Sequence, residues 1–391
     1  MSELNETTLP LNEAEVLVEK PRKKKKKKKK GGAFGRFLRR TLLLLFTIVL
    51  LAAGGLVMIL NTVFNGPSEA ARDVLTMSLS EASATKWVPG IFLGDEKVAE
   101  IRGKSGAALQ EEFSDASQVI INKDSALTAS DEWKDYPDGI RIEEYRGETY
   151  NAYIMIIRDP SQVYMATSTE GAFSESIPGT RIHNEIVDQG AIAAINAGAF
   201  NDDGSANSYV GSIPAGLLMV NGEVKSNKFH ERVPEEGFAG FTFDNILVVA
   251  KSMTPVQAKE LNIRDGCEFG PVLIMNGTVN QEAYNANSGY NPRTAIGQRA
   301  DGSVIFLCID GRQASSLGGT YRDIIDIMVE YGAVNACNMD GGSSSVMMYL
   351  DSQGRYGEAG EYVMINSYSL LQSEPRRMPN FWMVRPANEE G

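Results

Sequence analysis

The alternation of apolar and polar residues changes character about a third of the way along the chain, where short strand-like runs begin. Two runs rich in β-branched and aromatic side chains, ETYNAYIMIIRD (148–159) and SQVYMATS (161–168), are typical of strands. Three later pairs of apolar runs are joined by Asn221-Gly222, Asn276-Gly277 and Asp301-Gly302. Asn-Gly and Asp-Gly favour the type I′ turn, whose twist matches paired antiparallel strands. The pattern therefore predicts a largely antiparallel sheet.

One segment departs from this series of hairpins. SVIFLCID (303–310) is a strand-like run, TYRDIIDIMVEYG (320–332) has helical periodicity, and AVNACNMD (333–340) is another strand-like run. Thr320 and Asp323 give the helix a start that resembles a capping box. A strand, a helix and a strand in succession predict a right-handed crossover between parallel strands. We therefore expect an α+β fold, a mixed and largely antiparallel sheet domain with one βαβ unit.

Polar residues end both strands of this βαβ unit. Asp310 ends the first strand, Asp340 ends the second, and a glycine follows each of them. Parallel strands place their carboxyl ends at one edge of a sheet, where ligands of α/β units bind. A third apolar run, AIAAINAGAF (191–200), reaches Asn196 before its own glycine. A single Asp-Gly pair indicates only a turn, but the three strand ends together predict a functional site.

The residue types at these strand ends suit a reaction on a phosphorylated sugar. Two carboxylates in one cavity can act as acid and as base or nucleophile in glycoside hydrolysis, so Asp340 and Asp310 are the predicted catalytic pair. Arginine matches phosphate because it donates two parallel hydrogen bonds. The turn after Asp340 offers backbone N–H groups and hydroxyls. The predicted substrate-binding residues are Asn196, Arg293, Arg312, Gly341, Gly342, Ser343 and Ser344.

The small numbers of histidines and cysteines argue against several kinds of site. Only two histidines, His183 and His230, are present, which argues against a His-rich zinc site and a Ser-His-Asp triad. The three cysteines are too few for a disulfide framework in a domain of this size. Cys308 and Cys337 lie in apolar runs, so we expect buried thiols.

The amino-terminal part has the pattern of a membrane anchor. Residues 41–60 form an uncharged run of twenty residues, the length that a helix needs to cross a bilayer. Residues 20–40 hold thirteen Lys and Arg, including the unbroken run Lys23 to Lys30. Lys and Arg remain on the cytoplasmic side. We therefore predict a single-pass protein with a cytoplasmic tail (1–40), an anchor (41–61) and an external remainder.

The charge distribution also bears on binding partners. After position 61 the chain has 25 basic and 45 acidic residues, out of 38 and 50 in the whole sequence. The body of the protein is thus acidic, and the net positive charge is confined to a short tail. The lysine run could indicate nucleic-acid binding, but it lies against the predicted span, where it would attract anionic lipid headgroups, and we expect no nucleic acid.

Between the anchor and the sheet domain, residues 62–137 are predicted to form a helical stalk and a linker. SEAARDVLTMSLSEAS has a helical pattern with Ser68 as its N-cap, and GDEKVAEIRG is a second short helix. Residues 111–136 are polar and weakly patterned, as in a linker or an ordered extension. The sheet domain is assigned to residues 138–388.

Five motifs occur in order in this sheet domain: INAGAF, IPAGLLMVNGEV, EFGPVLIMNG, NPRTAIGQRADGSVIFLCIDGR and NMDGGSSS. Together they resemble the phosphodiester glycosidase family, which includes the mannose-6-phosphate uncovering enzyme (N-acetylglucosamine-1-phosphodiester alpha-N-acetylglucosaminidase) and membrane-anchored bacterial relatives. The resemblance implies hydrolysis of a sugar-1-phosphodiester, which releases the glycosyl group and leaves a phosphomonoester. The chain departs from the family pattern in NAG at 196–198, and in Pro375, which separates Glu374 from Arg376 after a matching Asn366.

Three functions fit these residues. The leading one is an extracytoplasmic glycosidase that acts on a sugar-1-phosphodiester, such as one in a cell-envelope glycan or glycopolymer. The second is a module that binds an anionic wall glycan without cleaving it. The third is a metal-dependent phosphodiesterase in which Asp310 and Asp340 ligate a divalent cation such as Ca²⁺, which prefers oxygen ligands. Turnover separates the first from the second, and chelator sensitivity together with the bond cleaved separates the first from the third.

Overall fold

The structure is a computed structural model that describes residues 33–80, 85–102, 112–120, 133–168, 173–201, 210–228, 237–368 and 374–387. Contacts divide the chain into two units, Met1–Ile59 and Leu60–Gly391. In the first unit, the described residues belong to helix α1 (Ala33–Phe64), which extends into the second. The predicted span 41–61 lies within α1, which is long and apolar enough over Arg36–Phe64 to cross a membrane as an anchor or a signal sequence. The lysine run lies outside the described residues.

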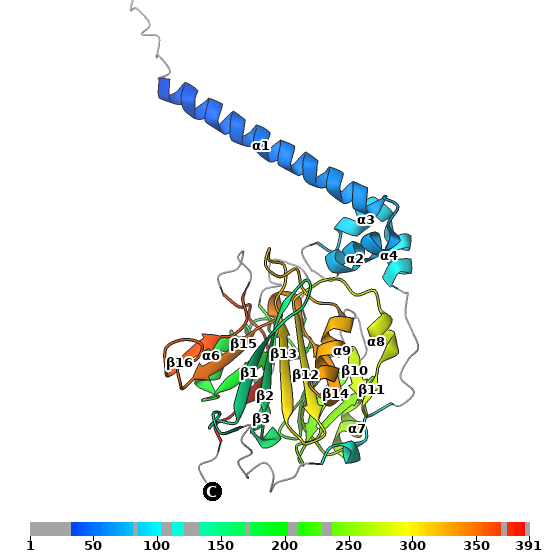
Figure 1. The fold of residues 1–391 in the computed structure, drawn as a ribbon, viewed down its shortest axis with the longest axis vertical. Helices are drawn as coiled ribbons and strands as arrows, with labels where there is room; N and C mark the ends of the chain where they lie inside the picture. The colour runs from blue at the N-terminus through cyan, green and yellow to red at the C-terminus, as the bar shows by residue number, and fades with distance from the viewer. Residues whose placement is uncertain are drawn as a thin grey trace, which may run out of the picture. The chain divides into compact units, whose positions relative to one another are not determined.

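The second unit contains three sheets, and every strand pair in them is antiparallel (Figure 1). The largest sheet has the order β1-β2-β13-β12-β14-β10-β11. Its strands are β1 (Ile140–Arg146), β2 (Asn151–Ile157), β13 (Val304–Ile309), β12 (Arg293–Arg299), β14 (Ala333–Met339), β10 (Val272–Met275) and β11 (Thr278–Val279).

Two five-stranded sheets complete the unit, with orders β16-β15-β4-β17-β3 and β6-β5-β9-β7-β8. The strands of the first are β16 (Glu361–Met364), β15 (Met347–Asp351), β4 (Ala193–Asn196), β17 (Asn380–Val384) and β3 (Val163–Thr167). The strands of the second are β6 (Glu223–Lys228), β5 (Gly216–Val220), β9 (Ile263–Glu268), β7 (Phe238–Thr242) and β8 (Leu247–Ala250).

Apolar side chains on alternate positions of the seven-stranded sheet form two cores. Phe306 and Cys308 of β13 face a core shared with the other two sheets, where Trp382 of β17 packs edge-on against Phe241 of β7. Ile305 and the other odd positions of β13 face helix α9 (Tyr321–Glu330) and α8 (Gln281–Asn285). The large sheet is therefore covered on both faces, by helices on one and by sheets on the other.

The predicted βαβ unit differs from the observed topology in one respect. Strands β13 and β14 run in the same direction, because each pairs antiparallel with β12. They are not neighbours, since β12 lies between them. The predicted direction of the two strands is therefore confirmed, but the prediction of a mixed sheet was wrong, because every described strand pair is antiparallel. The Asp301-Gly302 hairpin folds β12 back along β13 and places it between the two parallel strands. The predicted shared edge survives this correction, because Asp310 and Asp340 still follow the carboxyl ends of two codirectional strands.

Most of the local signals in the sequence are confirmed. Hairpins β5–β6 and β10–β11 turn through Asn-Gly pairs with positive φ at both residues. The capping box at α9 is present, with Asp323 N donating to Thr320 Oγ1 and Thr320 N donating to Asp323 Oδ2. The three cysteines are buried and free. The turn between β12 and β13 is longer than a two-residue type I′ turn, because Arg299 N donates to Ser303 O.

The predicted stalk contains three helices that contact one another: α2 (Glu69–Ser80), α3 (Val88–Leu93) and α4 (Asp95–Arg102). Ser68 caps α2 by accepting from Ala71 N at 3.3 Å, as predicted. The sequence signals did not indicate α3. The extension that follows joins a sheet edge, where Phe113 forms a bridge with Ala250. The remaining short helices are α6 (Ile182–Asp188), α7 (Pro255–Glu260), η1 (Ala116–Gln118), η3 (Pro160–Gln162) and η4 (Gly342–Ser344).

Candidate active site

Asp310 is a buried carboxylate at the carboxyl end of β13. It is only 2% exposed. Its Oδ1 accepts hydrogen bonds from Ser367 N at 2.9 Å and from Asn366 Nδ2 at 3.4 Å. Its Oδ2 is buried and has no hydrogen-bond partner among the described residues. Desolvation raises the pKa of Asp310 to about 6, and hydrogen bonds to the carboxylate only partly oppose the rise. A buried carboxylate with an unoccupied acceptor atom is what a proton-transfer site requires.

Asn366 connects Asp310 to the turn that follows β14. Its Nδ2 points to Asp310 Oδ1 and also to Ser345 O, at 3.3 Å. Its Oδ1 accepts from Met347 N at 2.8 Å, at the start of β15. The amide is 5% exposed, so these bonds fix its orientation. One side chain thereby positions the carboxylate of one strand end against the backbone of the other.

The turn Asp340–Ser345 is held by backbone bonds to the residues that flank two other strands, β4 and β12. Asp340 N donates to Ala197 O at 3.0 Å, and Gly342 N donates to Pro292 O at 2.8 Å. The N–H of Gly342, one of the groups expected to bind substrate, is thus engaged within the protein. Asp340 is half-buried, and the hydroxyls of Ser344 and Ser345 are buried without a hydrogen-bond partner among the described residues. The turn therefore holds a half-buried carboxylate beside two buried hydroxyls that have no partner among the described residues.

Asn196 reaches this turn from a different sheet. Its strand, β4, belongs to the five-stranded sheet with β15 and β17, but its amide donates to Asp340 O at 2.5 Å. Its Oδ1 accepts from Thr294 Oγ1 at 2.8 Å and from Val346 N at 3.2 Å. The structure therefore brings the third strand end to the predicted site. Asn196 is fully buried and bonded at both ends, so its hydrogen bonds hold the turn in place. Its contact with substrate remains a prediction.

Arg312 covers the glycines of the turn. Its backbone has φ 57°, a left-handed conformation that costs a non-glycine residue about 1–3 kcal/mol and that clusters at functional sites. A Cβ added to Gly342 would lie 3.2 Å from Arg312 Nη2, so the guanidinium lies directly over that residue. Arg312 Nη2 also donates to Asn291 Oδ1 at 2.9 Å. The side chain is exposed and offers positive charge beside the carboxylates.

Two further guanidiniums gather near the same turn. Arg376 Nη1 approaches Ser343 Oγ at 3.4 Å, and its guanidinium stacks 4.7 Å from the Phe200 ring centroid. Tyr368 OH donates to Ser343 O at 2.5 Å. Burial raises the pKa of Tyr368, while the charges of Arg376, Arg181 and Arg312 oppose that rise. We call Arg181, Arg312 and Arg376 the guanidinium cluster. Arg181 is paired with Glu374 at 2.8 Å, so Arg312 and Arg376 are the members of the cluster that contact the turn and are suited to an anionic group.

Arg293, predicted as a phosphate ligand, lies on the opposite face of β12, toward α9. Its Nη2 donates to Gly289 O at 2.7 Å, its Nε donates to Gly319 O at 3.1 Å, and its guanidinium stacks 4.5 Å from the Tyr321 ring centroid. These contacts tie the loop that contains Asn291, the partner of Arg312. A direct contact between Arg293 and phosphate remains a prediction.

Replacing Arg293 with lysine is expected to lower the melting temperature by several degrees, because lysine cannot bridge both carbonyls and stack on Tyr321. About 1–2 kcal/mol of stability should be lost, with only a secondary decrease in turnover. Thermal unfolding and steady-state kinetics, with Arg299→Lys as the control, measure both effects. An unchanged melting temperature with a tenfold or larger rise in KM would instead identify Arg293 as a direct phosphate ligand.

Comparison with known proteins bears on this arrangement. The family model for phosphodiester glycosidases matches residues 189–385, which include Asn196, Asp310, the turn Asp340–Ser345 and Arg376. The chain belongs to the phosphodiester glycosidase family. This family membership makes the protein a hydrolase, and the matched region contains both aspartates and the turn after β14, whereas Arg181 and Tyr153 precede it.

Individual relatives are more distant. The uncharacterized SPbeta prophage-derived protein YomE of Bacillus subtilis (strain 168) is 44% identical over 55 residues, which are 14% of this chain and 8% of that one. The zebrafish N-acetylglucosamine-1-phosphodiester alpha-N-acetylglucosaminidase catalytic domain, auto-inhibited by its pro-peptide, is 16% identical with TM-score 0.49 over 63% of this chain and 82% of that one. A hypothetical protein from Synechocystis is 14% identical with TM-score 0.41, over 63% and 62% of the two chains. The chain thus spans less than a tenth of the length of the curated relative, and membership rests on the family match.

Residues suited to a metal site are few at this edge. In the part of the chain that the structure describes, no group of three or more His, Cys, Asp or Glu side chains is placed to hold a metal ion. The carbonyls of Asp310 and Asp340 already accept hydrogen bonds from Ser316 and Asn196. Asp310 and Asp340 are the two carboxylates that the structure places at the ends of β13 and β14, and no step proposed below uses a metal.

The sequence patterns did not single out several residues that shape the site. Tyr153, Thr294, Ser345 and Tyr368 contact the predicted residues only through the tertiary fold. Asn366 was noted only through the tail motif of the family. It lies in the segment INS just after an apolar run, the same pattern that singled out Asn196.

Proposed function

We propose that the protein is an extracytoplasmic hydrolase that removes a glycosyl group from a sugar-1-phosphodiester, as in a cell-envelope glycan or glycopolymer. The observation that supports this most directly is the buried Asp310, whose Oδ2 lacks a partner among the described residues and whose Oδ1 is connected through Asn366 to the turn that Arg312 and Arg376 of the guanidinium cluster contact. The cluster suits the phosphate, and the carboxylate suits proton transfer at the anomeric carbon. Membership in the phosphodiester glycosidase family supports the same reaction class.

The leaving group decides how the carboxylates would be used. When the bond from the anomeric carbon to the phosphate oxygen breaks, the electron pair leaves with a phosphomonoester. The second pKa of such a monoester is about 6, so the leaving oxygen needs little protonation near neutral pH. The more demanding task is the activation of water. We therefore assign Asp310 as the general base: its Oδ2 accepts the proton of the water that attacks the anomeric carbon.

Asp340 is the second carboxylate in this scheme. It lies in the turn covered by Arg312 and is less buried than Asp310. Glycosyl transfer passes through an oxocarbenium-like transition state with positive charge on the sugar ring. An ionised Asp340 would stabilise that charge, and the guanidinium cluster would hold the departing phosphate. Asn196, Asn366 and Arg293 would position these groups without touching the substrate.

The test is product analysis with the full-length protein in detergent and a panel of methyl-phosphate diesters of hexose-1-phosphates. The proposal expects free sugar and methyl phosphate, with the oxygen of ¹⁸O-water in the sugar and no inhibition by a chelator. Sugar-1-phosphate and methanol, together with chelator sensitivity, would show the metal-dependent phosphodiesterase. Saturable binding of the diesters without products would show the glycan-binding module.

The membrane orientation is a separate prediction. The basic block before the apolar helix should remain in the cytoplasm, with residues 62–391 outside. Protease added to intact protoplasts should digest the bulk of the chain and leave a protected fragment of a few kilodaltons. Digestion confined to a short tail would show the opposite orientation.

The proposed attraction of the lysine run to anionic headgroups is a separate test. Binding of the protein to lipid vesicles with and without anionic lipid measures it.

A further inference from the structure

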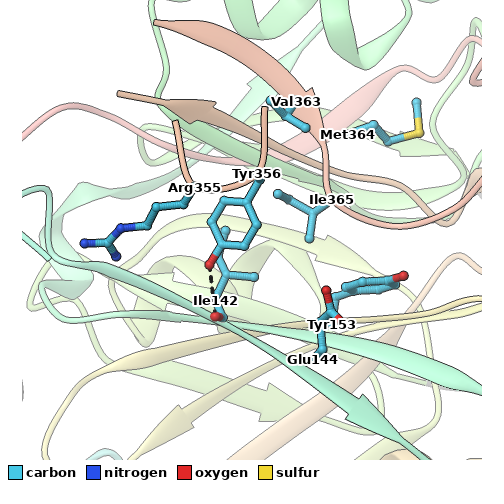
Figure 2. Close-up of a pocket in the computed structure, with 8 residues that line it drawn as sticks. All are labelled: Ile142, Glu144, Tyr153, Arg355, Tyr356, Val363, Met364 and Ile365. Carbon is cyan, nitrogen blue, oxygen red and sulfur yellow. Dashed lines mark hydrogen bonds between the residues drawn. The ribbon is translucent and has the colours of Figure 1, made fainter. Parts of the chain in front are cut away.

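A cavity of about 290 Å³ lies beside the site, between the large sheet and the sheet that contains β15 and β16. Figure 2 shows the side chains that line it, which come from β1, β2, the loop after β15, β16 and the residue that follows β16. Tyr356, in that loop, donates its hydroxyl to Ile142 O at 3.1 Å and so ties the two sheets together. The lining consists of Ile142, Glu144, Tyr153, Arg355, Tyr356, Val363, Met364 and Ile365.

Sheet register places one end of this cavity against Asp310. Tyr153 of β2 is the register partner of Cys308, and both face the core between the sheets. Asp310 follows Cys308 by two positions, so its side chain leaves the strand on the same face. The phenol of Tyr153 is close enough to Asp310 for the two groups to influence each other's pKa. Tyr153 thus lines the cavity and neighbours the carboxylate.

The wall of the cavity beside β16 also leads to Asp310. Ile365 lines the cavity, and the next two residues, Asn366 and Ser367, are the ones that donate to Asp310 Oδ1. Two independent chain segments therefore run from the cavity wall to the carboxylate. Arg312 and Arg376 of the guanidinium cluster contact the turn after β14, to which Asp310 is connected through Asn366 and Ser345.

The chemistry of the wall fits a neutral sugar ring. Aromatic rings such as those of Tyr153 and Tyr356 pack against the C–H face of a pyranose, and aliphatic side chains complete an apolar surface. Glu144 is exposed and can accept from sugar hydroxyls. In Figure 2 the guanidinium of Arg355 extends away from Tyr153, and it is stacked 4.6 Å from the Tyr136 ring centroid. The volume is at the lower end of the roughly 300–1,000 Å³ of small-molecule sites, in keeping with a single ring.

We propose that this cavity is the glycosyl subsite: it holds the sugar ring with its anomeric carbon toward Asp310, while the phosphate extends toward the guanidinium cluster. The inference rests on the proposed function for the identity of the reaction, but sugar binding can be measured without turnover. It makes the walls of β1, β2 and β16 the determinants of sugar specificity and leaves the turn after β14 to recognise the phosphate.

The experiment tests the subsite with two variants that change the cavity. Val363→Trp places a bulky ring in it, and Tyr356→Ala removes one wall. Val329→Trp, on the exposed side of α9, is the matched control. Saturation-transfer NMR measures binding of methyl α-glucoside, methyl α-galactoside and methyl α-N-acetylglucosaminide to the full-length protein in detergent, and inorganic phosphate is titrated separately.

The expected result is that at least one glycoside binds the unmodified protein and the control equally. Val363→Trp and Tyr356→Ala should weaken that binding tenfold or more without changing the phosphate affinity. In the diester assay the same variants should raise KM more than they lower kcat.

Other outcomes separate this inference from the proposed function. If Val363→Trp is misfolded by circular dichroism, Tyr356→Ala decides alone. Equal glycoside binding in all folded variants, or none to the unmodified protein, would overturn the subsite. Glycoside binding that depends on the cavity, without hydrolysis of any diester, would keep the subsite and refute the glycosidase. Normal hydrolysis of the diesters by both cavity variants would refute the subsite and keep the glycosidase.

Discussion

Replacing Asp310 with asparagine is expected to lower kcat/KM for a sugar-1-phosphodiester by on the order of 10³-fold or more, with the protein still folded. The change keeps the size of the side chain and an oxygen that can accept from Ser367 N, but it removes the only proposed acceptor of the proton from water. Asp188→Asn, on the exposed end of α6, is the matched control and should keep full activity. Activity near the unmodified level in folded Asp310→Asn would remove the general base from the mechanism.

Stability should change in the opposite direction. The pKa of Asp310 is raised from 3.8 to about 6 in the folded protein, so the fold favours the protonated form. The folded state therefore binds more protons than the unfolded state between these values, and the free energy of unfolding falls as pH rises from about 4 to about 6. Asp310→Asn removes this pH dependence. Above pH 6 its free energy of unfolding should exceed that of the unmodified protein by on the order of 1–3 kcal/mol.

The same titration sets the expected pH profile of the reaction. A general base works when ionised, so kcat/KM of the unmodified protein should rise as pH increases through about 6. Thermal unfolding and kinetics at matched pH values measure the two effects together. A rate that instead falls through pH 6 would mean that Asp310 acts as an acid.

The second large effect is expected for Asp340→Asn. Loss of the charge should remove the stabilisation of the oxocarbenium-like transition state and lower turnover by about 10²–10⁴-fold. The fold should persist, because the backbone bonds of Asp340 to Asn196 and Ala197 do not involve the carboxylate. Circular dichroism and the melting temperature check this. If folded Asp340→Asn turned over at the unmodified rate, the segment would be a structural turn only.

The double variant tests whether the two carboxylates act together. Residues that work as a unit show losses that are far from additive. Asp310→Asn with Asp340→Asn should therefore be little slower than the slower single variant. A loss equal to the product of the single losses would show that the two aspartates act independently.

The parts of the fold predictable from sequence were those set by local chemistry. Turn pairs such as Asn221-Gly222, the cap at Ser68 and the capping box of Thr320 and Asp323 depend on a few neighbouring residues, and the structure contains all of them. The order of the strands in a sheet is not set by residues that are adjacent in the sequence. Strand β12 lies between β13 and β14 because both of them pair with it, and such pairing is decided by the tertiary fold. The pattern of apolar residues in 303–340 does not contain that information.

The same division applies to the site. Asp310, Asp340 and Asn196 could be selected because each is a polar residue ending an apolar run. Arg293 looked equally suitable, but strand alternation turns its side chain toward α9, and that face could be assigned only once the register of β12 was known. The buried state of Asp310 depends on Asn366 and Ser367, more than fifty residues later in the chain.

The place of β17 in its sheet has a consequence for folding. This strand (Asn380–Val384) pairs on one side with β3 and on the other with β4, and both partners lie far earlier in the chain. A chain in which β17 has not yet docked would therefore expose two strand edges that β17 normally joins. Exposed edges of this kind recruit other strands and aggregate. Closure of this sheet depends on pairing over a long sequence separation, so the docking of β17 is the step at which aggregation competes with folding.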